Sequence, residues 1–380
     1  MKYRKFGKLD YQVSALGFGC MRLPTIGNKS RSGEVDEKES IRLIRSAIDR
    51  GVNYFDTAYP YHEGNSEIIL GKSLVDGYRD KVKLATKSPL WSVTSPGDFD
   101  KFLNEQLKKL QTEHIDFYLL HGIDKKRWEN TVLKFGLLEK AEKAIADGRI
   151  HHIGFSFHDN YESFKIVVDG YGRWDFCQIQ YNYMDIENQA GTKGLQYAAS
   201  KGLAVIVMEP LLGGKLATPP QEVRKVFEEY STKRSPVQWA LQWLWNQPEV
   251  TSVLSGMSSM QQLDENLQTA EEFSTQSLSS EDLKFIERVR SVFLKRAVVS
   301  CTKCGYCMPC PQGVNIPWIL ELYNNGIIYN DIPSAHFAYT HFVPEAQRAN
   351  VCNQCGQCEE KCPQGIKPGK LMSDIHGKLK

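Results

Sequence analysis

The sequence predicts a closed (β/α)8 barrel, or TIM barrel, followed by a small, mainly helical domain rich in cysteine. Three observations lead to this prediction. Eight short apolar runs alternate with helical segments between residues 13 and 256, eight of the ten cysteines follow residue 300, and 380 residues exceed what one ordinary core holds. We therefore expect a barrel domain over residues 1–295 and a second domain over residues 296–380.

The eight apolar runs are nearly continuously hydrophobic, which is typical of strands buried on both faces of a parallel sheet. They occupy residues 13–19, 53–58, 82–87, 115–122, 151–157, 175–182, 203–210 and 251–256. Amphipathic helices are expected at residues 37–51, 99–111 and 135–149, with Gly51 and Gly148 placed as left-handed caps. Eight strand–helix repeats favour a closed barrel, and the lack of a GxGxxG after any strand argues against a Rossmann dehydrogenase.

The composition excludes several classes of partner. A net charge of +2 gives no reason to expect nucleic acid or an anionic membrane. The start, MKYRKFGKLD, lacks the apolar region of a secretory signal, and apolar runs such as 203–208 are too short to span a bilayer. An intracellular chain with ten cysteines uses thiolates as ligands more readily than as disulfides. We therefore expect a cytoplasmic protein.

Three successive strands each bring an ionisable residue to the rim where such barrels place catalytic groups. The second strand leads into Asp56, the third ends at Lys87 and the fourth ends at His121. Each residue alone has an ordinary explanation, because an aspartate can cap a turn and a lysine or histidine at a loop start is commonly solvated. Their convergence on one rim favours a catalytic site.

The stretches NYFDTAYPYHEGNSEIILGKSL, LATK and YLLHG resemble the aldo-keto reductases, in matching order within roughly the first 270 residues. The resemblance implies a catalytic tetrad of Asp56, Tyr61, Lys87 and His121, in which spacing prefers Tyr61 over Tyr59. It also implies the reduction of an aldehyde or ketone by NADP(H) or NAD(H), with a small carbonyl compound or alcohol as the substrate.

The chemistry of the tetrad can be stated in physical terms. Hydride delivery to a carbonyl carbon requires a proton at oxygen, and a free tyrosine, with a pKa of about 10, is a weak acid for this purpose. The Lys87 ammonium is expected to lower the pKa of Tyr61, and Asp56 to keep Lys87 charged and in place. His121 is expected to polarise and orient the carbonyl oxygen.

The same resemblance implies a cofactor site at the ends of the later strands. Ser156 and Gln178 would bond the nicotinamide carboxamide, and the glycine pair after the seventh strand would let backbone N–H groups approach the pyrophosphate. No Lys or Arg occurs between Asn246 and Glu281, so this stretch lacks a side chain for bidentate recognition of a 2′-phosphate. The sequence therefore leaves both NADH and NADPH as candidate cofactors. The full set of expected contacts is Ser156, Gln178, Met208, Gly213, Gly214, Ser258, Gln262, Glu265 and Asn266.

Two cysteine runs, CTKCGYCMPCP (301–311) and CNQCGQCEEKCP (352–363), have ferredoxin spacing. The second matches the bacterial pattern, and the first is one residue short before its last cysteine. In two-cluster ferredoxins the fourth cysteine of a run ligates the other cluster. Zinc is disfavoured because it leaves the third evenly spaced cysteine unused. The two expected [4Fe–4S] ligand sets are Cys301, Cys304, Cys307 and Cys362, and Cys352, Cys355, Cys358 and Cys310.

The resemblance thus extends to the subset of aldo-keto reductases with a C-terminal ferredoxin-like domain. Carbonyl reduction by a nicotinamide does not need iron and sulfur, so two explanations of the clusters stay open. Either they relay electrons from an external one-electron carrier such as ferredoxin, or they only stabilise the fold. Two clusters are more than stabilisation of a small domain requires, which favours the relay. An alternative function is a nicotinamide-binding redox sensor, a regulatory protein with structural clusters, although a sensor needs no proton donor.

Overall fold

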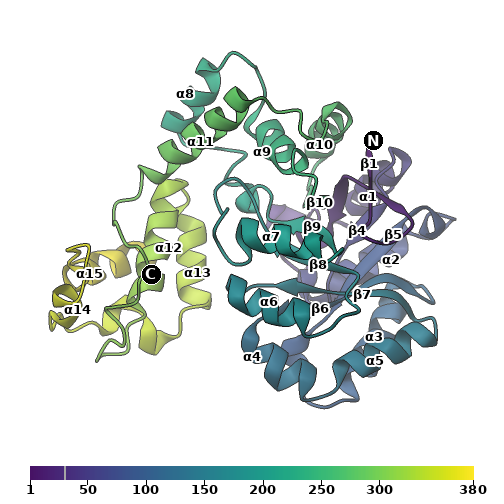
Figure 1. Cartoon of the computed structure of the whole chain (residues 1–380), viewed down its shortest axis with the longest axis horizontal. Coiled ribbons are helices and arrows are strands. Elements are labelled where there is room, and N and C mark those ends of the chain that lie inside the picture. The colour runs from purple at the N-terminus through teal and green to yellow at the C-terminus, as the bar shows by residue number, and fades with distance from the viewer. Residues whose placement is uncertain (30) are drawn as a thin grey trace. The chain divides into compact units, whose positions relative to one another are not determined.

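The computed structural model describes residues 1–29 and 31–380 of the chain (Figure 1). The chain divides into two compact units. The first contains residues 1–213 and 237–279, and the second contains residues 214–236 and 280–380. The short segment 214–236 therefore belongs to the same unit as the C-terminal region, although barrel residues precede and follow it in the sequence.

The first unit contains a closed barrel in which every neighbouring pair of strands is parallel, in the order β10-β3-β4-β5-β6-β7-β8-β9. Every predicted apolar run overlaps one barrel strand, and the first run, 13–19, also includes the last two residues of the separate strand β2 (Gln12–Ser14), so the predicted barrel is confirmed. The strands are β3 (Leu16–Gly19), β4 (Tyr54–Asp56), β5 (Lys83–Ser88), β6 (Ile115–Ile123), β7 (Ile150–Phe157), β8 (Phe176–Gln180), β9 (Ala204–Met208) and β10 (Val250–Ser255).

Helices follow the strands on the outside of the barrel (Figure 1). The helix α1 shows why they form: Asp36 caps it by accepting a hydrogen bond from the Glu39 N–H at 3.0 Å, and one apolar face is buried. Gly51 and Gly148 follow their helices with φ of 90° and 79°, as predicted. The helices of this unit are α1 (Glu37–Asp49), α2 (Asn65–Ser73), α3 (Asp98–Leu110), α4 (Lys125–Arg127), α5 (Leu137–Ala146), α6 (Tyr161–Asp169), α7 (Gly191–Ser200), α9 (Pro236–Trp245, its first residue assigned to the second unit) and α10 (Met260–Glu272).

A short antiparallel hairpin, β1 (Tyr3–Lys5) with β2 (Gln12–Ser14), precedes the barrel and was not predicted. It places Phe6 and Val13 in one buried cluster with barrel residues such as Phe117 and Phe176. The Phe6 and Phe117 rings stack with centroids 4.4 Å apart. The hairpin therefore fills the N-terminal end of the barrel with apolar side chains, and leaves the opposite end for chemistry.

The second unit is helical and has its own buried core, to which Val314, Ile319, Tyr339 and Ile375 contribute. Several cysteines of both runs pack against this core. Its helices are α8 (Gln221–Glu229), α11 (Ser280–Leu294), α12 (Ile316–Ile328), α13 (Ile332–His341), α14 (Gln357–Glu360) and α15 (Pro368–Leu379). Within residues 1–29 and 31–380, none of the helices combines the length and the hydropathy that a bilayer crossing requires.

Candidate active site

A buried ion pair joins the C-terminal ends of two neighbouring strands, β4 and β5. The Lys87 Nζ donates to Asp56 Oδ1 at 2.5 Å and to the Thr57 carbonyl at 2.7 Å, and the Lys87 and Asp56 side chains are 1% and 4% exposed. Burial raises the pKa of Asp56, and Lys87 offsets part of that effect. Burial lowers the pKa of Lys87, but Asp56 and Tyr61 more than compensate, so Lys87 stays a cation.

A second set of buried groups fixes the backbone of Lys87 by a hydrogen bond to its carbonyl. The Gln106 amide donates to the Lys87 carbonyl at 3.1 Å and to Glu67 Oε1 at 2.6 Å. Thr86 also donates to Glu67 Oε1, at 2.7 Å, and the Tyr118 hydroxyl donates to Gln106 Oε1 at 2.7 Å. The sequence analysis missed Glu67 and Gln106 in this role, because nothing in the order of residues brings α3 against the end of β5.

Tyr61 lies in a 3-10 turn, Tyr61–Gly64, that follows β4. Its hydroxyl lies 3.5 Å from Lys87 Nζ. The next residues, His62 and Glu63, have left-handed φ of 52° and 57°, a conformation that costs non-glycine residues about 1–3 kcal/mol each. Surrounding groups hold the turn in place, since His62 Nε2 accepts from the Leu23 N–H at 3.1 Å and Nδ1 donates to the Ser32 carbonyl at 2.7 Å. This strained turn fixes the phenol beside the ammonium.

The pKa of Tyr61 lies above its ordinary value, because burial raises it by more than Lys87 lowers it. The sequence-based expectation of a net lowered pKa was therefore wrong in direction, although the expected effect of the Lys87 ammonium is present. The phenol is protonated at neutral pH, which is the form that a proton donor needs.

His121 completes the cluster from β6. Its ring meets the Tyr61 ring edge-on, with centroids 6.1 Å apart and planes at 83°, and the Trp91 ring lies 4.9 Å away. The pKa of His121 is well below its ordinary value because of burial and then the nearby Lys87 cation, so the imidazole is neutral. Its buried Nδ1 has no hydrogen-bond partner among the described residues. The four predicted tetrad residues thus lie together at the C-terminal end of the barrel.

Two of the expected nicotinamide contacts lie next to this cluster. The Gln178 amide donates to Asp56 Oδ2 at 3.3 Å, whereas its buried Oε1 has no hydrogen-bond partner in the described part of the chain. A buried acceptor without a donor indicates a bond that a ligand can supply. The Ser156 hydroxyl accepts from the Gly122 N–H at 2.8 Å and keeps its own proton to donate.

The expected contacts farther from the tetrad lie in different environments. Gly213 has a left-handed φ of 69°, which favours glycine, and the Arg22 guanidinium lies close to it, since an added Cβ would lie 2.9 Å from Arg22 Nη2. Ser258 donates from its N–H to Gln262 Oε1 at 2.8 Å, at the exposed start of α10. Asn266 is buried and donates to the Ser255 hydroxyl at 2.9 Å, so this amide has a partner within the protein. The remaining expected positions are Met208 at the end of β9, Gly214 with φ of 99°, and Glu265 within α10.

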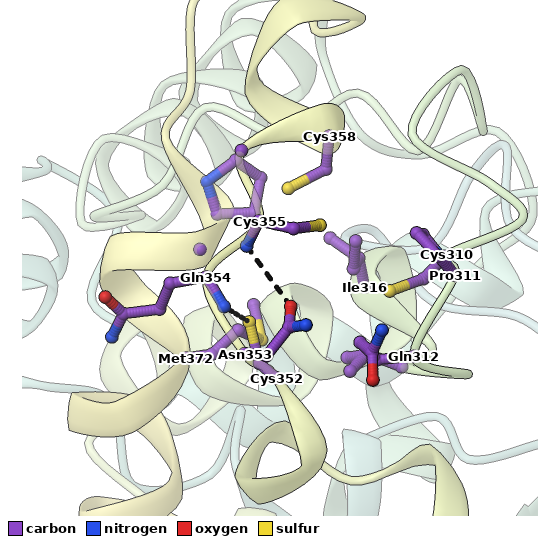
Figure 2. Close-up of a pocket in the computed structure, with 14 residues that line it drawn as sticks. Cys310, Pro311, Gln312, Ile316, Cys352, Asn353, Gln354, Cys355, Cys358 and Met372 are labelled. Carbon is purple, nitrogen blue, oxygen red and sulfur yellow. Dashed lines mark hydrogen bonds between the residues drawn. The ribbon is translucent and has the colours of Figure 1, made fainter.

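The cysteines of the second unit line two cavities. Cys310 lines one cavity together with Cys352, Cys355 and Cys358 (Figure 2). The first three cysteines of the 301–311 run line the other cavity together with Cys362. The structure thus brings together the same two sets that the ferredoxin spacing grouped. Ile316 and Pro368 line both cavities, so the two are adjacent.

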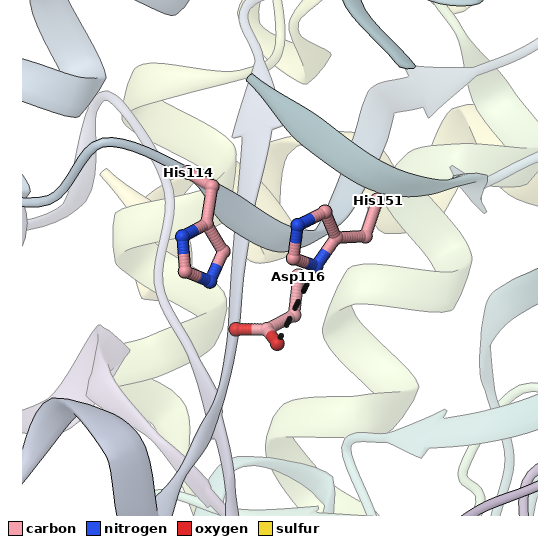
Figure 3. A group of neighbouring side chains, drawn as sticks. All are labelled: His114, Asp116 and His151. Atoms are coloured by element: carbon pink, nitrogen blue, oxygen red, sulfur yellow. Dashed lines mark ion pairs between the residues drawn. The ribbon is translucent and has the colours of Figure 1, made fainter. Parts of the chain in front are cut away.

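A separate group of His114, Asp116 and His151 lies at the N-terminal ends of β6 and β7 (Figure 3). Their ligand atoms lie within 4.8 Å of one another. The Asp116 carboxylate already accepts from Arg79 at 2.8 Å and from Lys83 at 3.3 Å. Two cations on the same carboxylate disfavour a metal ion there, and the group joins β5, β6 and β7 as structural support.

Comparisons with known proteins agree with this geometry. The sequence model of the Aldo/keto reductase family matches residues 15–290, and that of a 4Fe-4S dicluster domain matches residues 300–366. Uncharacterized oxidoreductase YqkF of Bacillus subtilis is 27% identical, covering 76% of this chain and 96% of the relative. L-galactose dehydrogenase of Arabidopsis thaliana is 28% identical, covering 76% and 94%.

A solved structure is similar over the same share of the chain. Aldo-keto reductase AKR11C1 from Bacillus halodurans, in its holo form, superposes with a TM-score of 0.62 at 27% identity, covering 76% of this chain and 96% of that one. The barrel fold, the buried tetrad cluster and the family match therefore all indicate the same family. The chain belongs to the aldo/keto reductase family of oxidoreductases and carries a C-terminal 4Fe-4S dicluster domain.

Proposed function

We propose that this protein reduces an aldehyde or ketone by NAD(P)H-dependent hydride transfer, with Tyr61 as the proton donor. The observation that carries the proposal is the position of Lys87 Nζ, 2.5 Å from Asp56 Oδ1 and 3.5 Å from the Tyr61 hydroxyl, in a buried cluster at the mouth of the barrel. When bound, a nicotinamide would supply the hydride that the carbonyl carbon accepts. The product is the alcohol, and its hydroxyl proton comes from Tyr61.

Each member of the tetrad has a defined task in this proposal. As the Tyr61 proton moves to the carbonyl oxygen, negative charge develops on the phenol, and the Lys87 cation stabilises that charge. Asp56 keeps Lys87 charged and pointed at the phenol. Neutral His121 faces the same space and orients the carbonyl oxygen.

The residues present fit a nicotinamide cofactor. Gln178 Oε1 is a buried acceptor suited to the carboxamide NH2, and Ser156 can donate to the carboxamide oxygen. Arg22 makes no hydrogen bond or ion pair with another residue that the structure describes, and its guanidinium lies against Gly213, where it suits a pyrophosphate. We propose Met208, Gly213, Gly214, Ser258, Gln262, Glu265 and Asn266 as the further lining of this cofactor site.

The two cysteine sets suit two [4Fe–4S] clusters, since each set of four thiolates lines one cavity. Such clusters transfer electrons one at a time. Because the cavities are adjacent, we assign the clusters a relay that accepts electrons from an external carrier.

The reductase proposal is tested by steady-state oxidation of NADPH and NADH against a panel of aldehydes and ketones. Protein purified without oxygen is assayed in parallel for iron and acid-labile sulfide. Turnover of a carbonyl supports the reductase. Tight nicotinamide binding without turnover of any carbonyl would contradict it and favour a redox sensor.

A further inference from the structure

Glu67 is a fully buried carboxylate outside the tetrad, and its two oxygens face different groups. It lies in α2 and is 0% exposed. Its Oε1 accepts from the Thr86 hydroxyl at 2.7 Å and from the Gln106 amide at 2.6 Å. Its Oε2 forms no hydrogen bond with a described residue and lies 3.6 Å from Lys109 Nζ. Each oxygen therefore begins a separate line of contacts.

The contacts of Oε1 lead to the backbone of Lys87. The Gln106 amide that donates to Glu67 also donates to the Lys87 carbonyl at 3.1 Å. The Tyr118 hydroxyl donates to Gln106 Oε1 at 2.7 Å, which fixes the direction in which the amide is turned. The register of β4 with β5 ends at Ala85, whereas β6 pairs with β5 as far as its last residue. Gln106 therefore adds a hydrogen bond at a strand end that β4 does not pair.

The contacts of Oε2 lead to the turn that carries Tyr61. Lys109 Nζ lies 4.1 Å from the centre of the Tyr59 ring, and an added Cβ on Gly64 would lie 3.6 Å from it. Gly64 is the last residue of that turn, and Tyr59 shortly precedes the turn. The Tyr59 hydroxyl donates to Glu105 at 3.2 Å, and Glu105 pairs with Lys109 at 3.4 Å. The Lys109 ammonium therefore lies against both ends of the loop that contains Tyr61.

We propose that Glu67 is a positioning residue, which sets the distance between the Tyr61 hydroxyl and Lys87 Nζ. It acts on the first group through Lys109 and on the second through Gln106. The inference rests on the proposed function, because it takes Tyr61 as the proton donor. One carboxylate joins the support of the phenol to the support of the ammonium, so both keep the 3.5 Å separation seen in the structure. A misplacement of about 1 Å at reacting groups lowers a rate by up to about 10²-fold.

The test measures hydride transfer in a single turnover, with saturating NADPH and the aldehyde or ketone that the wild type reduces fastest. The variants are Glu67→Gln, Gln106→Met and Lys109→Met, which keep side chains of similar length and remove a charge or hydrogen bonds. Circular dichroism shows whether each variant folds. The Lys109 side chain is 18% exposed, so Lys109→Met carries the test if a substitution at a fully buried position prevents folding.

Two control variants remove similar interactions elsewhere in the barrel. Ser252→Ala removes a buried hydroxyl that donates to the Ser14 carbonyl at 2.8 Å. Lys140→Met breaks an ion pair with Asp100, on the same helix as Lys109, at 3.3 Å. Both controls should reduce the carbonyl at the rate of the wild type, because neither contact leads to Tyr61 or Lys87.

We expect Gln106→Met to lower the rate of hydride transfer by about 10–100-fold. Lys109→Met should lower it by about 3–10-fold, and Glu67→Gln by a similar factor, because glutamine keeps an acceptor for Gln106 but loses the ion pair with Lys109. The KM for the carbonyl and the dissociation constant for NADPH should change less than about twofold, since a positioning residue acts on the chemical step. Rates equal to the wild type in all three variants would overturn the inference.

The same substitutions in the Tyr61→Phe background separate positioning from a general loss of structure. Gln106→Met should not lower the remaining rate of Tyr61→Phe any further, because the proton that it positions is already gone. If Gln106→Met lowers the rate by the same factor in both backgrounds, the network only stabilises the barrel and the positioning role is wrong.

The Tyr61→Phe variant also separates this inference from the proposed function. A rate equal to that of the wild type in Tyr61→Phe would contradict the proposed function, and the inference with it. A large deficit in Tyr61→Phe together with unchanged rates in Gln106→Met and Lys109→Met would overturn the positioning role alone and leave the reductase intact.

Discussion

The ammonium nitrogen of Lys87 lies 2.5 Å from Oδ1 of Asp56, and both side chains are almost completely buried. A buried charge without its partner is strongly unfavourable. The pair therefore has two consequences that can be separated by experiment: it keeps a cation beside the Tyr61 hydroxyl, and it makes the folded barrel depend on both charges.

Replacement of Lys87 by methionine should lower the free energy of unfolding by about 3–5 kcal/mol, because Asp56 is left buried without a cation. Urea unfolding measures the loss. The control is Lys72→Met, which breaks a surface pair with Glu37 at 2.7 Å and should cost less than about 1 kcal/mol. Similar losses of unfolding free energy in the two variants would show that the buried pair stabilises the fold no more than the surface pair does.

Asp116→Asn should destabilise the barrel in a pH-dependent way. Burial raises the pKa of Asp116. Arg79, the Leu84 N–H and Lys83 together lower this pKa by more than burial raises it, so the pKa in the folded state lies below the unfolded value of about 3.9. The stabilisation is therefore complete above the unfolded pKa and is lost as the pH falls through the folded pKa. We expect a deficit of about 1–3 kcal/mol at pH 7 that shrinks below about pH 4.

Unfolding by urea at several pH values measures this deficit. Glu113→Gln is the control, because Glu113 is exposed and has no ion pair with another described residue. A deficit for Asp116→Asn that stays constant from pH 7 to pH 3 would contradict the assignment of a paired, charged carboxylate.

The crossed ligand sets predict which pairs of cysteine variants act on the same cluster. Cys310→Ser combined with Cys355→Ser should leave about half of the wild-type iron, because both residues line one cavity. Cys310→Ser combined with Cys304→Ser should remove nearly all of it, because the two line different cavities. Iron analysis after anaerobic purification gives the answer, and the reverse order would show that each run ligates its own cluster.

Gln178→Met should weaken nicotinamide binding about tenfold, because it removes the buried acceptor Oε1 that has no partner within the described chain. Quenching of protein fluorescence by NADPH or NADH measures the dissociation constant. Gln180→Met is the matched control, since Gln180 lies two residues farther along and bonds Asp185 at 2.7 Å. Unchanged affinity in Gln178→Met would remove this residue from the cofactor site.

The sequence predicted the barrel because its strands are buried on both faces, which leaves long apolar runs. The hairpin β1–β2 was not predicted, because three-residue strands that include Arg4, Lys5 and Gln12 carry no such signal. Only the folded chain shows that Phe6, between these strands, enters the barrel core.

Three of the tetrad residues could be predicted because they stand at strand ends, and Tyr61 because its spacing from Asp56 matches the family pattern. The direction of the pKa shift of Tyr61 was not predicted, because the burial that raises this pKa is a property of the folded site and cannot be read from the spacing of residues. The partner of Asn266 was missed for a related reason: a sequence does not show whether an amide turns toward a ligand or toward its own barrel, as it does here toward Ser255.

The most direct test of the proton-donor role of Tyr61 is the rate of carbonyl reduction by Tyr61→Phe under single-turnover conditions with saturating NADPH. The variant keeps the ring beside Lys87 and removes only the proton. We expect the rate of hydride transfer to fall by about 10²–10⁴-fold while the dissociation constant for NADPH changes little. A rate close to that of the wild type would show that another group protonates the carbonyl oxygen, and would contradict the role given to Tyr61.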